Sequence, residues 1–452
     1  MYSIDEFAFY GSLMNMYEGL MNFNIKGLFS FGFYSYGFLY FLVQLITTLP
    51  FFYLDTPELV IFTTRMLTSA FACGSIYLII STIPNTNRKT KYLIILIILS
   101  IPAFWRNAFW NHPDWMMTFF ILAFINQLSK AEFAFSRKYW LAILMFSIAV
   151  STKIQALIFS PILILYFFRC IKINPGEIKN HFKIIIRTGV LIITVFLLTN
   201  PYIIHPDGLD AFVKSFLANM KSNANNHGSG EIVTITTKIK DIIFNYYFNL
   251  YSILLISTAV LYLFLKKKST FTLFTMVTLS ALVALVYVLI FVNKDWQHYY
   301  LPVIILLVLP LSQIRLKNNK QTLTFFVLVL MAQLIGNLNA YHYIITKGHQ
   351  PKIENNLEQN IKISEGIIRK LEPVIRTDDH ILIAPYIPFE FNKLSLTYKN
   401  IHLIYGPLQE FMYNKKAHEL ISIKKPFNPK RFIIILKKSI HLNPELYLNR
   451  AD

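Results

Sequence analysis

The sequence predicts a polytopic α-helical membrane protein. Of its 452 residues, 55% are hydrophobic and only 15% are charged, whereas soluble domains carry about 25% charged residues. Its 40 Phe and 26 Tyr suit helices that face lipid and the membrane interfaces. The apolar residues are gathered in repeated runs, and a helix needs roughly 20 apolar residues to cross the hydrocarbon core. These observations predict a membrane module followed by a more polar C-terminal region.

We predict about ten spans, several of them short or next to a polar break. They lie near residues 59–81, 92–108, 115–129, 139–151, 154–168, 187–200, 243–265, 271–292, 299–314 and 322–345. The connecting loops alternate between rich and poor in Lys and Arg, and the basic loops are 85–91, 130–138, 169–187, 266–268 and 315–320. Because short cytoplasmic loops carry the excess of basic residues, these loops are predicted to be cytoplasmic and the others extracytoplasmic.

This orientation also accounts for the net charge of +19. A nucleic-acid-binding protein gathers its basic residues into a patch on a folded surface. Here they are spread over short loops between apolar runs, so we expect no nucleic-acid partner. The composition is rich in Lys, Asn and Ile, which suggests an AT-rich genome. We therefore expect a bacterial inner membrane rather than an endoplasmic reticulum.

The orientation predicts the positions of both ends of the chain. If 59–81 runs inward, residues 1–58 form an extracytoplasmic first loop with juxtamembrane helices. The apolar run 36–54 then lies in the interface or dips partway, with an eleventh span as the alternative. Residues 59–345 form the transmembrane module. Residues 346–452 are predicted to form a small extracytoplasmic α/β domain, because short β-type runs occur at 380–385, 400–404 and 431–437.

The candidate chemical groups all fall on the predicted extracytoplasmic side. They are Asp5, Glu6, His112, Asp114, Lys153, His205, Asp207, His227, Asp295 and His298. A transporter is expected to hold ionisable groups near the midplane, often in repeat-related broken helices, and neither pattern is convincing here. An enzyme that works at one membrane surface is therefore favoured. A glycolipid transporter or flippase, or a non-catalytic assembly protein, is the alternative.

Each of these groups also has a purely structural explanation. Asp5 and Glu6 could be a solvated terminal pair. Asp114 could cap the helix that follows it. Lys153 lies in an apolar region, where an unpaired ammonium is costly, so it either extends to the interface or pairs with a buried anion; we favour the anion. Arg65 presents the same choice more weakly.

Short motifs follow one another in a particular order along residues 1–315. They are Asp5-Glu6-Phe7-Ala8-Phe9-Tyr10, the Tyr-rich segment 34–42, Arg65, His112-Pro113-Asp114, Thr152-Lys153, Asn200-Pro201-Tyr202 and His298-Tyr299-Tyr300-Leu301-Pro302. As an ordered set they resemble the lipid-dependent membrane glycosyltransferases of the GT-C fold, among them the protein O-mannosyltransferases, aminoarabinose transferases and RgtA-D-like enzymes. In that family a span precedes the acidic loop, whereas this sequence is expected to begin inside the loop. The family also usually has Arg where this chain has His298.

The resemblance implies inverting transfer of a sugar from a polyprenyl-phosphate donor to a lipid, polysaccharide or protein acceptor at the extracytoplasmic face. The site residues that it implies are Asp5, Glu6 and Asp114 as catalytic acids, Lys153, Arg65 and His298 at the donor phosphate, and Tyr10, His112 and Tyr299 against the substrate. Asp5 is the expected base for the acceptor hydroxyl. A divalent cation is the candidate cofactor, with Asp5 and Asp114 as its candidate ligands.

Overall fold

The computed structural model divides the chain into two compact units. One consists of Met1–Ala8 and Ile345–Asp452, and the other of Phe9–Ile344. The structure describes residues 4–29, 31–32, 34, 36–54, 57–83, 88–175, 178–224, 232–246, 253, 256–261, 272–294, 296–313, 320–338, 342, 357–373, 380–383, 401–403, 432–436 and 439–442.

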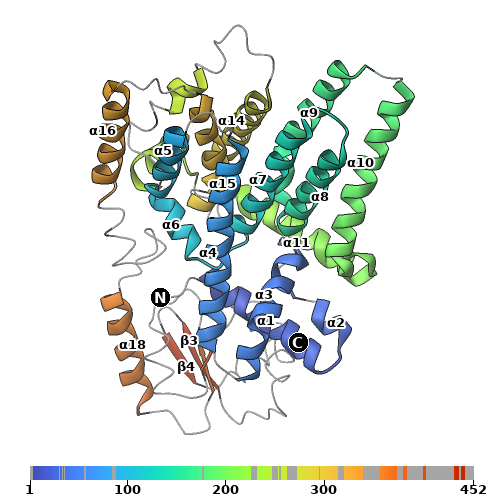
Figure 1. Ribbon diagram of the computed structural model, residues 1–452. Helices are drawn as coiled ribbons and strands as arrows, with labels where there is room; N and C mark the ends of the chain where they lie inside the picture. The colour runs from blue at the N-terminus through green and yellow to red at the C-terminus, as the bar shows by residue number, and fades with distance from the viewer. Residues whose placement is uncertain are drawn as a thin grey trace. The chain divides into compact units, whose positions relative to one another are not determined.

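The larger unit is built of helices (Figure 1). From the N-terminus these are α1 (Ile4–Met21), which begins in the smaller unit, α2 (Ile25–Phe29), α3 (Phe38–Tyr53), α4 (Pro57–Thr82), α5 (Arg88–Leu99), α6 (Pro102–Ala108), α7 (Asp114–Ala131), α8 (Arg137–Thr152), η1 (Ile154–Phe159) and α9 (Ser160–Ile173). They continue with α10 (Ile178–Thr199), η2 (Pro201–Ile204), α11 (Pro206–Ala224), α12 (Ile235–Lys240), η4 (Asp241–Tyr246), α14 (Leu273–Phe291), α15 (Gln297–Val308), η5 (Leu309–Gln313) and α16 (Lys320–Gly336).

Among the described residues, four helical stretches are long and apolar enough to cross a membrane. They are Leu59–Thr82, Ile154–Ile173, Lys179–Thr199 and Leu273–Phe291. Each coincides with a predicted span within a few residues, except that Lys179–Thr199 starts earlier. Of the predicted span 243–265, residues 247–252, 254–255 and 262–265 lie outside the described residues. The chain is therefore an integral membrane protein, while the count of ten spans stays a prediction.

The predicted span 92–108 is a bent pair of helices. α5 and α6 meet at an angle of 71°, and Pro102 occupies the first turn of α6. Proline suits that position because it has no N–H to place in the preceding turn. The indole N–H of Trp105 donates to the carbonyl of Leu99 at 2.7 Å, which satisfies an acceptor that the bend leaves without a helical partner.

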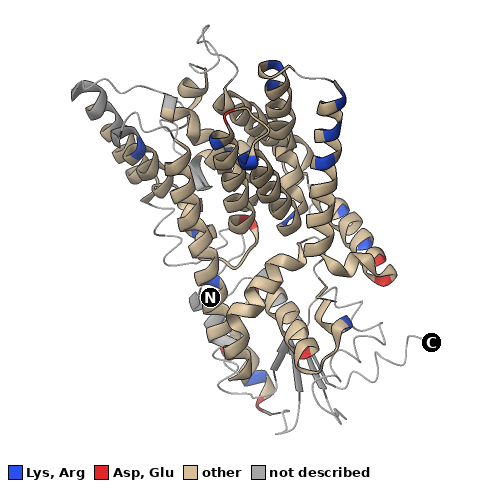
Figure 2. Ribbon diagram, turned by 45° about the vertical axis from the view of Figure 1, so that its right-hand side comes forward, with Lys and Arg blue, Asp and Glu red and all other residues tan. Residues whose placement is uncertain are grey.

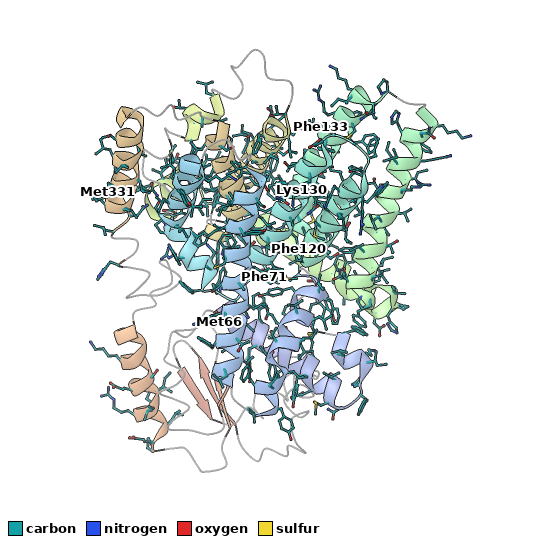
Figure 3. The ribbon with its side chains drawn as sticks, in the orientation of Figure 1. Met66, Phe71, Phe120, Lys130, Phe133 and Met331 are labelled. Atoms are coloured by element: carbon teal, nitrogen blue, oxygen red, sulfur yellow. The ribbon has the colours of Figure 1, made fainter. Side chains whose placement is uncertain are left out.

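The core surrounds α7, which packs against α4 and α8. The sequence of α7 is apolar on most sides, as expected of a fully enclosed helix, and its Trp115 and Phe124 are buried. On its α4 side, Phe71 lies 6.3 Å from Phe120 between ring centroids (Figure 3). In contrast, only 11% of the span in α10 is buried, which is the pattern of a helix that faces lipid.

Basic residues gather at one end of α9 and of α10. Figure 2 shows Lys and Arg at the upper ends of α9 and α10, whereas α11 carries both Asp and Lys. The upper ends of α9 and α10 flank the loop 169–187, which the sequence predicts to be cytoplasmic. This distribution agrees with the positive-inside rule.

The smaller unit contains α18 (Leu357–Leu371) and a four-stranded sheet. The strands are β1 (His380–Ile383), β2 (Ile401–Leu403), β3 (Phe432–Leu436) and β4 (Ser439–Leu442), in the order β2-β1-β3-β4. β1 pairs in parallel with β2 and β3, and β4 is antiparallel to β3. The first three lie within the predicted β-type runs, whereas β4 has no counterpart in the prediction. The extracytoplasmic position of this unit stays a prediction.

Candidate active site

A buried ion pair lies at the N-terminus of α7. Asp114 is the first residue of that helix, and its Oδ1 lies 2.8 Å from Nζ of Lys153. The two side chains are only 3% and 2% exposed. His112 contacts the other carboxylate oxygen through Nδ1. Because unpaired charge is costly away from water, Lys153 and Asp114 stabilise one another.

Lys153 reaches this position because the helix stops just before it. α8 ends at Thr152, and Lys153 has extended backbone angles, φ −155° and ψ 118°. It forms an isolated antiparallel bridge with Tyr36. The N–H of Gly37 donates to the carbonyl of Thr152 at 2.9 Å. A short 3₁₀ helix, η1, then resumes the span. A continuous helix would place this residue on a helical face, so the break is what lets Lys153 join the site.

Aromatic rings enclose the ion pair. Trp110 stacks on His112 with ring centroids 4.2 Å apart and an interplanar angle of 19°. His298, in the first turn of α15, lies 4.6 Å from His112 between centroids and 4.4 Å from Tyr299. Nζ of Lys153 is 5.7 Å from the centroid of the Tyr299 ring. Such walls lower the local dielectric and so strengthen electrostatic interactions inside the site.

The segment around Tyr36 positions two members of the site. The Tyr36 hydroxyl lies 3.3 Å from Nε2 of His112, and its backbone bridges Lys153. The next residues are also held, because the N–H of Phe38 donates to Oδ1 of Asn200 at 2.9 Å. Tyr36 thus connects the loop before α7 with the break after α8.

A polar contact from α3 holds the same loop. The hydroxyl of Tyr40 donates to Oδ1 of Asn111 at 2.7 Å, and Nε2 of Gln44 donates to the same oxygen at 2.9 Å. All three side chains are buried. Because a buried amide group costs free energy when it is not satisfied, these bonds favour one conformation of the loop that carries His112 and Asp114.

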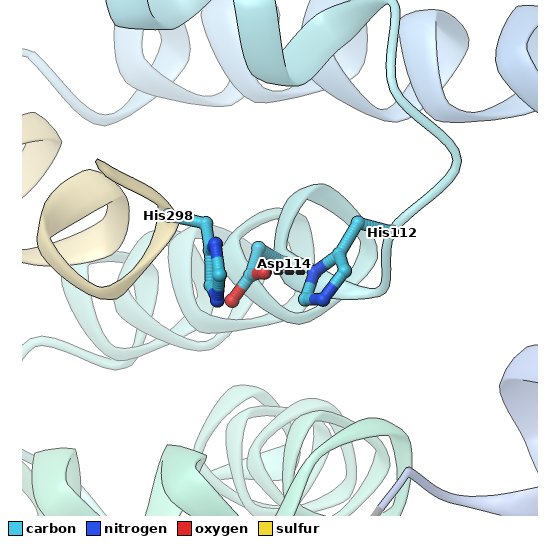
Figure 4. Close-up of side chains that lie close together, drawn as sticks. All are labelled: His112, Asp114 and His298. Carbon is cyan, nitrogen blue, oxygen red and sulfur yellow. Dashed lines mark ion pairs between the residues drawn. The ribbon is translucent and has the colours of Figure 1, made fainter. Parts of the chain in front are cut away.

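Three donors in the site are arranged as ligands of a metal ion could be. One ligand atom from each of His112, Asp114 and His298 can be chosen so that all lie within 4.8 Å of one another. Figure 4 shows the carboxylate of Asp114 between the two imidazole rings. All three residues are buried. The predicted pair of metal ligands was Asp5 with Asp114, and only Asp114 is among the side chains that the structure describes.

The structure brings together five of the nine predicted site residues, namely His112, Asp114, Lys153, His298 and Tyr299. Tyr10 packs on Phe52 with ring centroids 5.6 Å apart. Glu6 is buried, and Arg65 is half-buried on α4. The side chain of Asp5 lies outside the described part of the chain. The roles of all nine residues stay predictions.

Two of the groups predicted to lie in outer loops, Asp207 and His205, are exposed. Asp207, in the first turn of α11, accepts a hydrogen bond of 2.8 Å from Nζ of Lys26. This bond raises the pKa of Lys26 above its ordinary value. His205 lies 3.8 Å from the same carboxylate. His227 and Asp295 lie outside the described residues.

Sequence reasoning did not single out three residues that shape the site, namely Tyr36, Trp110 and Phe9. Phe9 lies 5.5 Å from Tyr36 and 5.7 Å from His112 between ring centroids. Phe9 and Tyr36 lie within two of the motifs used for the resemblance, and Trp110 lies two residues before His112. The sequence does not show that these motifs lie close together in the folded chain.

The fold is that of a polytopic membrane protein with the GT-C architecture. Its structure is similar to that of ArnT from Cupriavidus metallidurans bound to undecaprenyl phosphate, with a TM-score of 0.57 and 10% sequence identity over 98% of this chain and 90% of that one. Apo ArnT from the same organism gives a TM-score of 0.51 and 10% identity over 98% and 89%. No family model and no curated protein matches the sequence. The predicted GT-C fold is confirmed.

Proposed function

We propose that the protein is a glycosyltransferase that moves a sugar from a polyprenyl-phosphate donor to an acceptor, with inversion at the anomeric carbon. The observation that carries this proposal is the buried Asp114–Lys153 pair at 2.8 Å, enclosed by His112 and His298 in a GT-C fold. An enclosed cation beside an acid is what transfer from a phosphate leaving group needs. The similar ArnT structure is bound to undecaprenyl phosphate, which supports a donor of that class.

The proposed step forms one bond and breaks another. The acceptor hydroxyl oxygen attacks the anomeric carbon from the face opposite the phosphate. The bond from that carbon to the phosphate oxygen breaks, and its electron pair leaves with the phosphate. The hydroxyl proton passes to the carboxylate of Asp5, the proposed base, with Glu6 supporting it. Lys153 stabilises the charge that develops on the departing phosphate, assisted by His298 and Arg65.

Asp5 is proposed as the base because the ordered motifs that resemble the GT-C enzymes have an acid at this position. Asp114 is less suited to take the proton, because its two oxygens already contact Lys153 and His112. We assign to Asp114 the orientation of Lys153 and of the acceptor.

An apolar cavity of about 640 Å³ offers room for the isoprenoid tail. Residues of α12, η4, α14 and α15 contribute to its wall, including Ile239, Ile242, Leu285, Leu289, Ile304 and Leu307. The polar end of α15 carries His298, six residues before Ile304, which at 1.5 Å per residue is a distance of about 9 Å along the helix. A lipid with its phosphate beside His298 would thus have an apolar surface for its first isoprene units.

We expect neutralising Asp5 to abolish transfer without unfolding the protein. In Asp5→Asn the amide cannot accept the hydroxyl proton, and loss of a general base lowers turnover by about 10²–10⁴-fold. The measurement is sugar transfer from a radiolabelled polyprenyl-phosphate donor in membranes with matched expression. Asp210→Asn is the matched control, since Asp210 forms an exposed ion pair with Lys214, and it should retain transfer.

The same assay separates the proposed enzyme from its rivals. A glycolipid transporter or flippase would move its substrate without cleaving a bond and would tolerate Asp5→Asn. A non-catalytic assembly protein would tolerate it as well. Wild-type protein that releases no polyprenyl phosphate from any donor, or an Asp5→Asn variant with full turnover, would remove Asp5 catalysis from consideration.

We further propose about ten spans, with the active face and the C-terminal domain outside a bacterial inner membrane. Single cysteines in a Cys73→Ser background test this orientation, because Cys73 is exposed and Cys170 is buried. Cysteine at Lys214 should react with a membrane-impermeant maleimide in intact cells. Cysteine at Lys138, in a basic loop, should react only after permeabilisation. Both positions are exposed, so the opposite pattern would reverse the proposed orientation.

A further inference from the structure

We infer that His112, Asp114 and His298 form a transition-metal site. Their ligand atoms lie within 4.8 Å of one another, whereas ligands of a tetrahedral zinc ion are about 3.3 Å apart, given metal–ligand bonds of about 2.0–2.2 Å. Small side-chain rotations would draw the farthest pair of atoms together and would separate Nδ1 of His112 from the Asp114 oxygen that it now contacts. Two imidazoles and one carboxylate are a donor set typical of Zn²⁺ and its neighbours, whereas Mg²⁺ prefers oxygen ligands. This inference replaces the predicted ligand pair of two carboxylates, Asp5 and Asp114, with one carboxylate and two imidazoles.

The partners of these side chains orient them as ligands. Metal-bound histidines usually use their second ring nitrogen for a hydrogen bond, which fixes the ring. Nε2 of His112 lies 3.3 Å from the Tyr36 hydroxyl, which leaves Nδ1 directed at Asp114. Asp114 is held in turn, because its Oδ1 contacts Lys153 and its Oδ2 faces His112. The two oxygens of Asp114 thus have separate tasks.

The charge of the site leaves a role for a cation. Lys153 contributes one positive charge and Asp114 one negative charge, so with neutral imidazoles the buried group has no net charge. Lys153 is then the sole positive charge among these residues that attracts the departing polyprenyl phosphate, which is an anion. A divalent ion would bring the site to a net charge of two, which complements the phosphate, and three protein ligands leave a position open, as in catalytic zinc sites. This role rests on the proposed function, whereas metal binding does not.

Enclosure of the site supports the same inference. His112, Asp114 and His298 are each between 2% and 4% exposed, and Trp110 packs against both imidazoles, with ring centroids at 4.2 and 5.2 Å. Burial of a carboxylate and two imidazoles in a shared dry site is costly unless their polar atoms are engaged. Coordination engages one atom of each at once.

Cobalt is the probe for this site, because tetrahedral Co²⁺ substitutes for Zn²⁺ and absorbs visible light. The purified full-length protein is stripped with a chelator in detergent, titrated with Co²⁺, and analysed by absorption and elemental analysis, with no donor or acceptor present. We expect one equivalent of Co²⁺, displaced by Zn²⁺. His298→Ala and His112→Ala should weaken binding by more than about 100-fold, since loss of a second-shell partner alone costs about 10–100-fold. Tyr36→Phe removes only the hydroxyl that contacts Nε2 of His112, so it should weaken Co²⁺ binding by about 10–100-fold.

His205→Ala is the matched control, because His205 is exposed beside Asp207 and should leave the titration unchanged. His298→Asn, which retains a polar side chain of similar size, serves if His298→Ala fails to fold, and circular dichroism verifies each variant. Wild-type protein that takes up no more Co²⁺ than His298→Asn would overturn the site. Transfer that persists in metal-free protein would overturn the metal's role and leave the proposed reaction intact. Metal uptake without any sugar transfer would support the metal site and contradict the proposed reaction.

Discussion

Replacing Lys153 with methionine is expected to abolish transfer and to destabilise the protein. Lys153→Met removes the cation proposed for the departing phosphate, a loss of about 10²–10³-fold in turnover for one such electrostatic group. It also leaves the buried carboxylate of Asp114 without its partner at 2.8 Å. Breaking a buried pair from one side costs about 3–5 kcal/mol. Thermal unfolding in detergent and the transfer assay measure the two effects separately.

A double variant distinguishes the structural role from the catalytic one. In Lys153→Met/Asp114→Leu both charges are gone, and apolar replacement of a buried pair is often neutral or stabilising. We therefore expect the unfolding temperature to return toward the wild-type value while transfer stays lost. Lys214→Met is the control, because the Lys214–Asp210 pair is 75% and 61% exposed and exposed pairs contribute about 0–1 kcal/mol. A double variant that regains transfer would show that Lys153 acts only through folding.

The sequence was sufficient for several of the membrane helices. Span positions follow from apolar length, so Leu59–Thr82 and Leu273–Phe291 could be predicted closely, whereas the orientation inferred from loop charge stays a prediction. The bend between α5 and α6 was missed although Pro102 signals it. The alternation of the spans predicts that His112, Lys153 and His298 lie on one face of the membrane. It carries no information about the distances between them.

What a single sequence could not provide is the convergence of distant segments. Tyr36, Trp110, Lys153 and His298 are brought together by packing among α3, α7, α8 and α15, and no local pattern encodes those contacts. Trp110 in a short loop is also what any membrane interface would show, so its stacking on His112 had no sequence signal. The free-energy cost of an unpaired buried ammonium was enough to predict that Lys153 pairs with an anion. It did not identify Asp114 as that anion.

Gly37 was overlooked for the same reason, and we expect Gly37→Ala to inactivate the protein. A Cβ at this position would lie 1.4 Å from the carbonyl oxygen of Ser151 and 2.6 Å from its carbon. The φ of −73° at Gly37 suits any residue, so the restriction is steric. Both clashing atoms are backbone and cannot rotate away. The segment 36–38 must therefore move away from the residues just before Lys153.

That movement would reach the site through three connections. It would break the bond from the Gly37 N–H to Thr152, the Tyr36–Lys153 bridge and the bond from Phe38 to Asn200. At about 0.5–1.5 kcal/mol per hydrogen bond, their loss lowers stability moderately. The effect on transfer should be larger, about 10²-fold, because a displacement of about 1 Å in a positioning element has that consequence. The turnover number and the unfolding temperature measure these two effects.

Gly189→Ala provides the matched control for this prediction. Gly189 lies within α10, and a Cβ there would meet no atom within 4 Å. Alanine favours a helix interior over glycine by about 1 kcal/mol, so this variant should be at least as stable as wild type and equally active. If Gly37→Ala behaved like Gly189→Ala, the contact between segment 36–38 and the end of α8 would not be needed to hold Lys153. Tyr36 would then act on the site through His112 alone, because only the 3.3 Å contact with Nε2 would be left to convey its position.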